Sequence, residues 1–130
     1  MIVVAIFSII MTLSIGGYRQ HLLRTNRSDA TAALLRIAAA QERHYLDHDR
    51  YAEALDELGF SATSERGYYL LTLQSDDPAR EFRAKAQPDP HERQHGDRAC
   101  EIFTMDQSGL RGAASSNVKE SADDVERCWR

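Results

Sequence analysis

Histidine and cysteine are the residue types in this 130-residue chain that could bind a metal or act as a nucleophile. His44 and His48 are spaced i, i+4 in a helical pattern, and His91 and His95 repeat that spacing in a polar segment. A structural zinc site needs four ligands, and no cysteine lies near either pair. Carboxylates such as Asp47 are common on solvated helices. The sequence therefore predicts no metal and no cofactor.

Patterns for covalent catalysis are also missing from the sequence. It contains no Gly-rich phosphate loop, no nucleophile elbow and no cysteine–histidine catalytic pattern. The adjacent acids Asp123 and Asp124 are expected to be solvated loop residues. We therefore predict that the chain is not an enzyme, has no catalytic residues and takes no small-molecule substrate.

The two cysteines, Cys100 and Cys128, both lie in the last third of the chain. An even pair in an exported domain favours a disulfide, whereas two free thiols would suit a cytosolic protein. Closing a loop of roughly 28 residues would stabilise the fold by about 3.5 kcal/mol on the loop-entropy model. An uncharged apolar N-terminus points to export, so we expect the bond.

Arg19, Arg24 and Arg27 directly follow the apolar N-terminus, where they could contact lipid headgroups or neighbouring subunits. The formal net charge of −4 gives no electrostatic case for nucleic acid as the main partner. Nucleic acid is therefore not expected as a partner, although DNA binding stays open as an alternative.

The first 15 residues, MIVVAIFSIIMTLSI, carry no charge. A signal peptide normally begins with a basic region, and nothing basic precedes Ile2. As a helix this segment would reach about 22 Å, less than the roughly 30 Å of bilayer hydrocarbon. It could span a membrane only if further apolar residues preceded Met1. A buried helix is the remaining alternative.

The helical faces of this segment differ in residue size. Small or weakly polar residues form one stripe, and small residues let helix backbones approach closely in apolar surroundings. Large aliphatic residues form the other faces. We predict that the segment packs in a membrane or a filament core, although any membrane helix could carry such residues by chance. The small stripe is Ala5, Ser8, Thr12 and Gly16, and the packing residues opposite are Ile2, Val3, Ile6, Ile9 and Leu13.

Gly16 and Gly17 are expected to interrupt the helix, weakening it by about 2 kcal/mol relative to two alanines. An amphipathic pattern then continues to about Arg50, so the two halves would form a rod of roughly 75 Å. We divide the chain into an apolar half-helix, 1–17, and a globular domain, 18–130. The predicted core face of the second half comprises Leu23, Ala30, Leu34, Ile37, Gln41 and Tyr45.

Beyond Gly59 the apolar period changes from 3.6 to 2, which is typical of strands. We expect strands at 68–74, 82–87, 101–106 and 110–113, forming a three- or four-stranded antiparallel meander on the helix. The segment 88–98 is predicted to be a polar loop. Weak periodicity predicts that 114–130 is a surface loop pinned by the disulfide. The fold class is therefore α+β.

Several motifs resemble one known family. Thr25-Asn26-Arg27-Ser28-Asp29-Ala30 and the helix after it, the hairpin Met105-Asp106-Gln107-Ser108-Gly109, and Cys128-Trp129 at the C-terminus are similar to those of type IV pilins. The resemblance is strongest to the PilE-type minor pilins of Gram-negative bacteria, and it covers almost the whole chain.

The resemblance implies a lollipop-shaped subunit that is stored in the inner membrane with a periplasmic domain and then moves into an extracellular pilus. Its expected partners are other pilins, major and minor, and the inner-membrane assembly platform. We expect a minor pilin that helps initiate or decorate a pilus used for twitching motility, adhesion or DNA uptake. A type II secretion pseudopilin and a DNA-receptor pilin are the alternatives.

The chain departs from the family pattern at its beginning. The N-methylated first residue and the early glutamate of the family have no counterpart here, because the chain starts downstream of both. Gly16 stands where the family often has a proline, so Gly16 and Gly17 would supply helix flexibility through backbone entropy.

Overall fold

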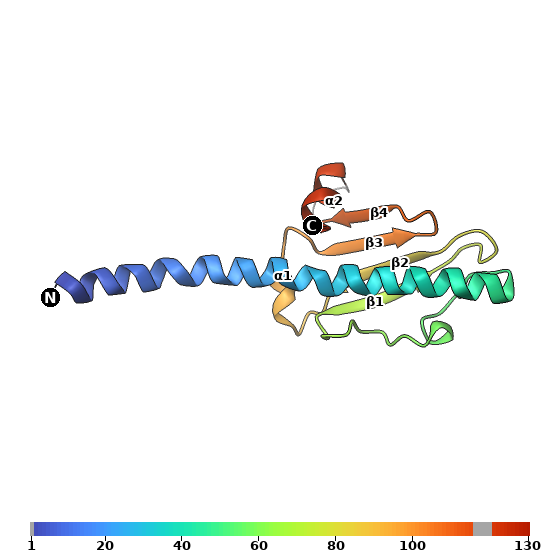
Figure 1. The fold of residues 1–130 in the computed structure, drawn as a ribbon, viewed down its shortest axis with the longest axis horizontal. Coiled ribbons are helices and arrows are strands. Elements are labelled where there is room, and N and C mark those ends of the chain that lie inside the picture. Colours follow the sequence, from blue (N-terminus) through green and yellow to red (C-terminus); the bar gives the residue numbers. More distant parts are fainter. Residues whose placement is uncertain (1, 116–120) are drawn as a thin grey trace.

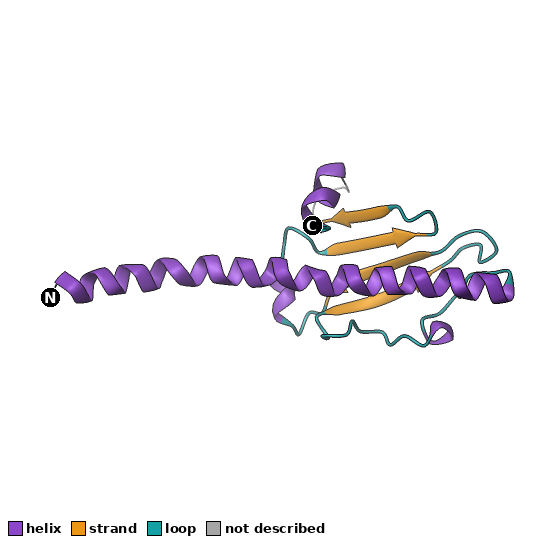
Figure 2. Ribbon diagram, in the orientation of Figure 1, coloured by secondary structure: helices purple, strands orange, loops and turns teal. Residues whose placement is uncertain are grey.

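A computed structural model describes residues 2–115 and 121–130, except for the side chains at positions 5, 7 and 9–15. One helix, α1 (Ile2–His48), extends far beyond a small head made of a four-stranded sheet and short helices (Figure 1). The head covers only the C-terminal half of α1 (Figure 2). This arrangement confirms the predicted α+β lollipop.

The length of α1 follows from its composition. The chain has no proline before Pro78, and alanines are frequent between residues 30 and 40, so nothing forces an early end. The helix ends where Asp49 adopts a left-handed conformation, with φ of 54°, and donates its N–H to the Tyr45 carbonyl at 2.8 Å.

The helix continues through Gly16 and Gly17. The expectation that these residues interrupt it was wrong, because two glycines lower helix stability without removing a hydrogen-bond donor. Their weakening effect on the helix stays a prediction.

The sheet is an antiparallel meander in the order β1-β2-β3-β4. Its strands are β1 (Tyr69–Gln74), β2 (Arg83–Pro88), β3 (Ile102–Asp106) and β4 (Arg111–Ala114). All four lie within about a residue of the predicted ranges. The turns between β1 and β2 and between β3 and β4 lie at the end of the head away from the N-terminus (Figure 1).

The core lies between one face of α1 and one face of the sheet. Ala30, Leu34 and Ile37 are fully buried, as the helical period predicted. Ala84 and Ala86 are buried in β2 while Arg83 points outward, because successive strand residues alternate between faces. Small alanines here let the helix approach the sheet closely.

Two polar residues of α1 bind the segment that leads from α1 to β1. The side-chain amide of Gln41, which is fully buried, donates to the Ala52 carbonyl at 2.9 Å and accepts from the Ala52 N–H at 2.7 Å. Asp29 accepts a 2.6 Å hydrogen bond from the Ser64 hydroxyl. These bonds satisfy buried polar groups and hold the segment against the helix.

Within residues 2–115 and 121–130, three short helices complete the head. The 3-10 helix η1 (Asp56–Leu58) ends at Gly59, whose φ is 75°. The 3-10 helix η2 (Arg93–Gly96) lies in the segment predicted to be a loop. The third helix, α2 (Ala122–Cys128), lies in the predicted surface loop, so that expectation was wrong.

Helix α2 is too short to show an apolar period, but its N-terminus carries a capping sequence. The Ser121 hydroxyl accepts from the Asp124 N–H at 3.3 Å and donates to the Asp124 carboxylate at 2.8 Å. A serine hydroxyl that accepts from the backbone N–H three positions later is typical of helix N-termini.

Candidate functional site

The first candidate surface is the apolar half of α1, which no other part of the described chain covers. Ile2, Val3, Val4 and Ile6 are 78%, 65%, 68% and 51% exposed. Ser8 is also exposed, and its hydroxyl donates to the Val4 carbonyl at 2.8 Å, as hydroxyls in apolar helices commonly do.

The predicted packing residues Ala5, Ile9, Thr12 and Leu13 lie outside the described side chains. Within the part of the chain that is described, no helix is both long and apolar enough to cross a membrane. The packing role of this half-helix therefore stays a prediction.

The second candidate surface is the neck, which we define as residues 16–27 of α1 together with residues 92–98 packed against them. Arg27 and Asp97 form its centre. The guanidinium donates from Nε and Nη2 to the two carboxylate oxygens at 2.6 and 2.8 Å, and the residues are only 7% and 4% exposed. Arg27 was predicted to contact headgroups or neighbours, and the structure shows that it is buried in an ion pair instead.

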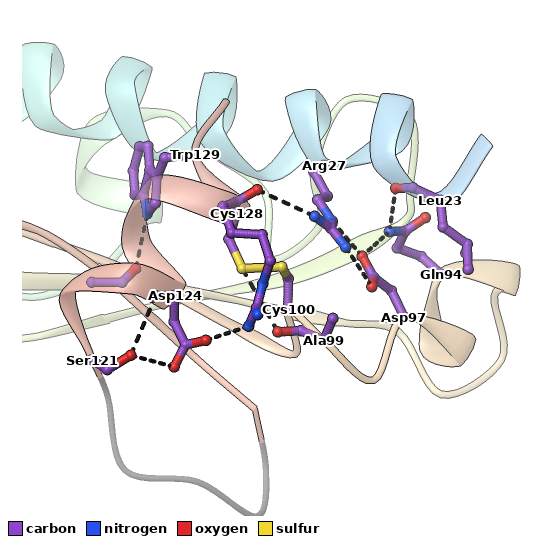
Figure 3. The surroundings of a disulfide bond; sticks show 12 residues. Leu23, Arg27, Gln94, Asp97, Ala99, Cys100, Ser121, Asp124, Cys128 and Trp129 are labelled. Carbon is purple, nitrogen blue, oxygen red and sulfur yellow. Dashed lines mark hydrogen bonds and ion pairs between the residues drawn. A yellow bond between two sulfur atoms is a disulfide. The ribbon is translucent and has the colours of Figure 1, made fainter. Parts of the chain in front are cut away.

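Gln94 provides a second contact between η2 and α1. Its side-chain amide donates to the Leu23 carbonyl at 2.9 Å and to the Asp97 carboxylate at 3.2 Å (Figure 3). Nearby, burial raises the pKa of the Tyr69 hydroxyl above its ordinary range, and the Asp97 carboxylate raises it further. The η2 segment is therefore held on the helix by buried hydrogen bonds from Arg27 and Gln94.

The disulfide lies beside this cluster and confirms the predicted pairing of Cys100 with Cys128. Their Cα atoms are 5.8 Å apart, and the bond joins the end of α2 to Cys100, two residues before the start of β3 (Figure 3). Trp129 follows directly and donates from its indole nitrogen to the Gly112 carbonyl at 2.9 Å. The Arg111 guanidinium lies 5.1 Å from the centre of the Trp129 ring.

Arg19 and Arg24 remain exposed on the neck, unlike Arg27. Arg19 lines a groove of about 360 Å³ that runs from Gly16 to Ala99. Arg24 lines a second groove of about 640 Å³, between α1 and α2. Arg27 and Ala99 border both grooves, so both grooves adjoin the buried ion pair.

Two of the histidines contact each other and the backbone at the C-terminal end of α1. His44 and His48 stack with ring centroids 4.2 Å apart, and Nδ1 of His44 lies 3.0 Å from the Arg50 carbonyl. Residues 91–95 spell H-E-x-x-H, but the zincin pattern requires a regular helix, and η2 begins only at Arg93. Among the described residues, no three histidines, cysteines or carboxylates are grouped as metal ligands.

Sequence reasoning missed Asp97 and Gln94. Both lie in a polar segment with no periodicity, 70 and 71 positions along the chain from the helix residues that they bind. No local signal could have found these long-range contacts. The helix α2 did have a signal, because Ser121 and Asp124 have the spacing of a capping box.

Comparison with protein families shows a match over most of the chain. The family described as "Type IV minor pilin ComP, DNA uptake sequence receptor" matches residues 17–104, which include the C-terminal half of α1 and most of the sheet. No curated protein sequence matches significantly.

Solved structures with the same fold include two pilins. The non-core minor pilin PilV of Neisseria meningitidis is 24% identical, with a TM-score of 0.58, covering 76% of this chain and 93% of that one. A type IV pilin from Shewanella oneidensis is 28% identical, with a TM-score of 0.52, covering 68% of this chain and 89% of that one.

Proposed function

Because the chain belongs to the family of the type IV minor pilin ComP, DNA uptake sequence receptor, we propose that it is a structural subunit that helps initiate or decorate a type IV pilus. This role requires no chemistry of its own, and we infer that the chain is not an enzyme. The family match favours this role over the alternative of a type II secretion pseudopilin.

One observation carries the proposal: the apolar half of α1 projects from the head, and its described apolar side chains Ile2, Val3, Val4 and Ile6 are exposed. Burying such a side chain is worth about 1.5–3 kcal/mol, so several of them strongly favour an apolar environment. Lipid and a bundle of sister helices both provide one. The free energy of moving this half-helix from lipid into the bundle can then be close to zero.

The small free energy of transfer allows the subunit to move from the membrane into the filament. The subunit is stored in the inner membrane with its head in the periplasm, and the assembly platform then moves it into the extracellular filament, where other pilins surround it. Residues 1–17 act as the anchor and filament-core segment, and residues 18–130 act as the head. Gly16 and Gly17 lie at the boundary, and their low helix propensity lets the helix bend there.

Deletion of the gene tests the proposal. We expect loss or reduction of surface pili, restored by the intact gene, and a small amount of the chain in filaments sheared from the cell surface. A chain that dominates the sheared filaments would be a major pilin instead. Normal piliation without any trace of the chain in the filaments would overturn the proposal.

The family description also favours a second function, reception of DNA during uptake. The expectation that nucleic acid is not a partner therefore has no support from the comparison. The net charge of −4 does not prevent local contacts, because cationic residues such as Arg83 and Lys85 lie on the outer face of the sheet. Binding of the full chain to duplex DNA, weakening steeply with salt, would support this function. Absence of binding at low salt would remove it.

A further inference from the structure

Charge is divided between the two ends of the head. The neck segments 16–27 and 92–98 contain five arginines and two carboxylates, a net charge of +3. The opposite end, segments 42–58 and 75–83, contains nine carboxylates and four arginines, a net charge of −5. These last two segments are adjacent, since the Tyr51 N–H donates to the Pro78 carbonyl at 2.8 Å.

Pairing within the neck does not cancel its positive charge. Asp97 is engaged with Arg27, and Arg98 forms a 3.2 Å ion pair with Glu101. Arg19, Arg24 and Arg93 are exposed and have no ion pair with any residue that the structure describes. Glu92 is the remaining carboxylate of these segments. On the neighbouring helix α2, Arg127 pairs with Asp124 and Arg130 pairs with Glu126.

The neck lies directly above the apolar half of α1. If that half enters a bilayer as far as Ile15, Arg19 lies about 6 Å and Arg24 about 13 Å farther along the helix axis. The interfacial region of one leaflet is about 5–8 Å thick, and arginine side chains reach several ångströms along a helix to find polar groups. Tyr18 is 64% exposed at the same level, where aromatic residues are enriched in membrane proteins.

The segment 92–98, which includes η2, forms the second side of the neck. Arg27 and Gln94 hold η2 on α1, so the backbone at Arg93 stays next to the helix. The groove from Gly16 to Ala99 opens between the two elements and has a volume of about 360 Å³, with Arg19 along it. A phosphate headgroup would meet cationic side chains from two connected elements.

We propose that the neck is a docking surface for a bilayer of anionic phospholipids, and that it holds the head upright on the membrane before assembly. This inference rests on the proposed storage of the apolar half of α1 in a membrane. The acidic opposite end would be repelled from the same bilayer, so the head has one favoured orientation. Sequence alone placed Arg19 and Arg24 near headgroups, and the structure removes Arg27 from this set and adds Arg93.

The experiment compares binding of the full chain to vesicles of phosphatidylcholine with binding to vesicles that also contain phosphatidylglycerol, at low and high salt. Each basic residue near an anionic surface contributes about fivefold to binding, so three exposed arginines predict a preference of about 100-fold for the anionic vesicles at low salt. The preference should fall as salt rises.

The variant R19Q/R24Q/R93Q should lose most of the preference while still binding phosphatidylcholine through its apolar half. The matched control R43Q/R66Q/R83Q removes three exposed arginines elsewhere on the molecule and should keep the preference. Amide hydrogen exchange supplies a local measurement: segment 92–98 should be protected more on anionic than on neutral vesicles.

Three results would overturn the inference. The first is an equal loss of the preference for anionic vesicles in the neck variant and in the control variant. The second is amide exchange in segment 92–98 that is no slower on anionic than on neutral vesicles. The third is a neck variant that loses binding to duplex DNA or to pilin filaments but keeps the preference for anionic vesicles. Failure to bind either kind of vesicle would instead count against membrane storage, and absence from sheared filaments would count against the pilin role.

Discussion

At the scale of single residues, the Arg27–Asp97 pair connects the helix to a distant segment. Removing two charges from water costs several kcal/mol, which is recovered only through good geometry and further hydrogen bonds. Here both guanidinium nitrogens facing Asp97 are used, and Nη1 also donates to the Arg127 carbonyl at 3.4 Å. The pair therefore fixes how η2 and the C-terminal region meet α1.

Replacing one partner should be costly because it leaves the other charge buried and unpaired. We expect R27Q to lower the free energy of unfolding by about 3–5 kcal/mol, and the apolar double variant R27M/D97L to cost clearly less. Urea unfolding of the full chain in detergent, followed by circular dichroism, measures both. The control R36Q removes an exposed arginine paired with Glu65 and should change stability by no more than about 1 kcal/mol. A small effect of R27Q would contradict the role assigned to the pair.

Asp106 organises the β3–β4 hairpin. Its Oδ1 atom accepts from the Ser108 N–H at 2.9 Å, the Ser108 hydroxyl at 2.6 Å and the Leu110 N–H at 3.1 Å. Partial burial raises the pKa of the Asp106 carboxyl, but these hydrogen bonds outweigh burial, so the pKa lies below its ordinary value. The charged form is thus the one that the folded turn favours.

A carboxyl whose pKa is lower in the folded than in the unfolded state stabilises the fold at pH values above its unfolded-state pKa, which is near 4. This stabilisation is lost as the pH falls through the folded-state pKa. D106N should therefore lower stability by about 1–2 kcal/mol at neutral pH, with a smaller difference from the wild type in acid. Urea midpoints at a series of pH values measure the difference. In D76N, a substitution at an exposed position of another turn, the difference should be small at every pH. A pH-independent cost for D106N would argue against a charged acceptor.

At the scale of elements, α2 depends on its attachments. A seven-residue helix is not stable in isolation, because helix nucleation is costly and few hydrogen bonds follow. The disulfide to Cys100 and the hydrogen bond from Trp129 to Gly112 hold α2 against the sheet. The segment after β4 thus acquires structure from tertiary contacts.

The variant C100S/C128S should lose about 3.5 kcal/mol of stability, because the unfolded chain regains the freedom of the closed loop. We also expect amide exchange in α2 to become faster than in the β-strands. Urea unfolding with and without a reductant measures the first effect, and the reductant should change the wild type but leave the variant unaffected. Unchanged protection of α2 in the variant would show that the disulfide is not what holds it.

At the scale of the whole molecule, the folding stability of the head does not depend on the apolar half of α1. Val4 and Ile6 contact nothing in the head, so charges there should leave its stability unchanged. We expect V4K/I6K to keep the wild-type unfolding midpoint, to dissolve more readily without detergent and to disappear from sheared filaments.

The control L46K/L110K places two lysines at exposed positions of the head, which are 81% and 68% exposed in the wild type. It should still enter filaments and should still require detergent. Normal filament entry of V4K/I6K would contradict the proposed packing of this half among sister helices.

Local patterns in the sequence were enough to predict the framework of the molecule. Ala30, Leu34 and Ile37 recur at the helical period, and the alternation in β2 and the turn at Gly109 mark a meander, because each depends on neighbours within a few residues. The even cysteine pair likewise predicted the disulfide. The exposed apolar half of α1 followed from its lack of charge and from its length.

Only the tertiary structure determines which arginines are exposed on the neck. Arg19, Arg24 and Arg27 look alike in the sequence, yet only Arg27 is buried, because Asp97 reaches it from a loop 70 positions away. The same folding step brings η2, which carries Arg93, against α1 near Leu23 and separates the basic neck from the acidic end. Periodicity describes which face of an element is buried, but which distant segment covers that face depends on the packing of the whole chain.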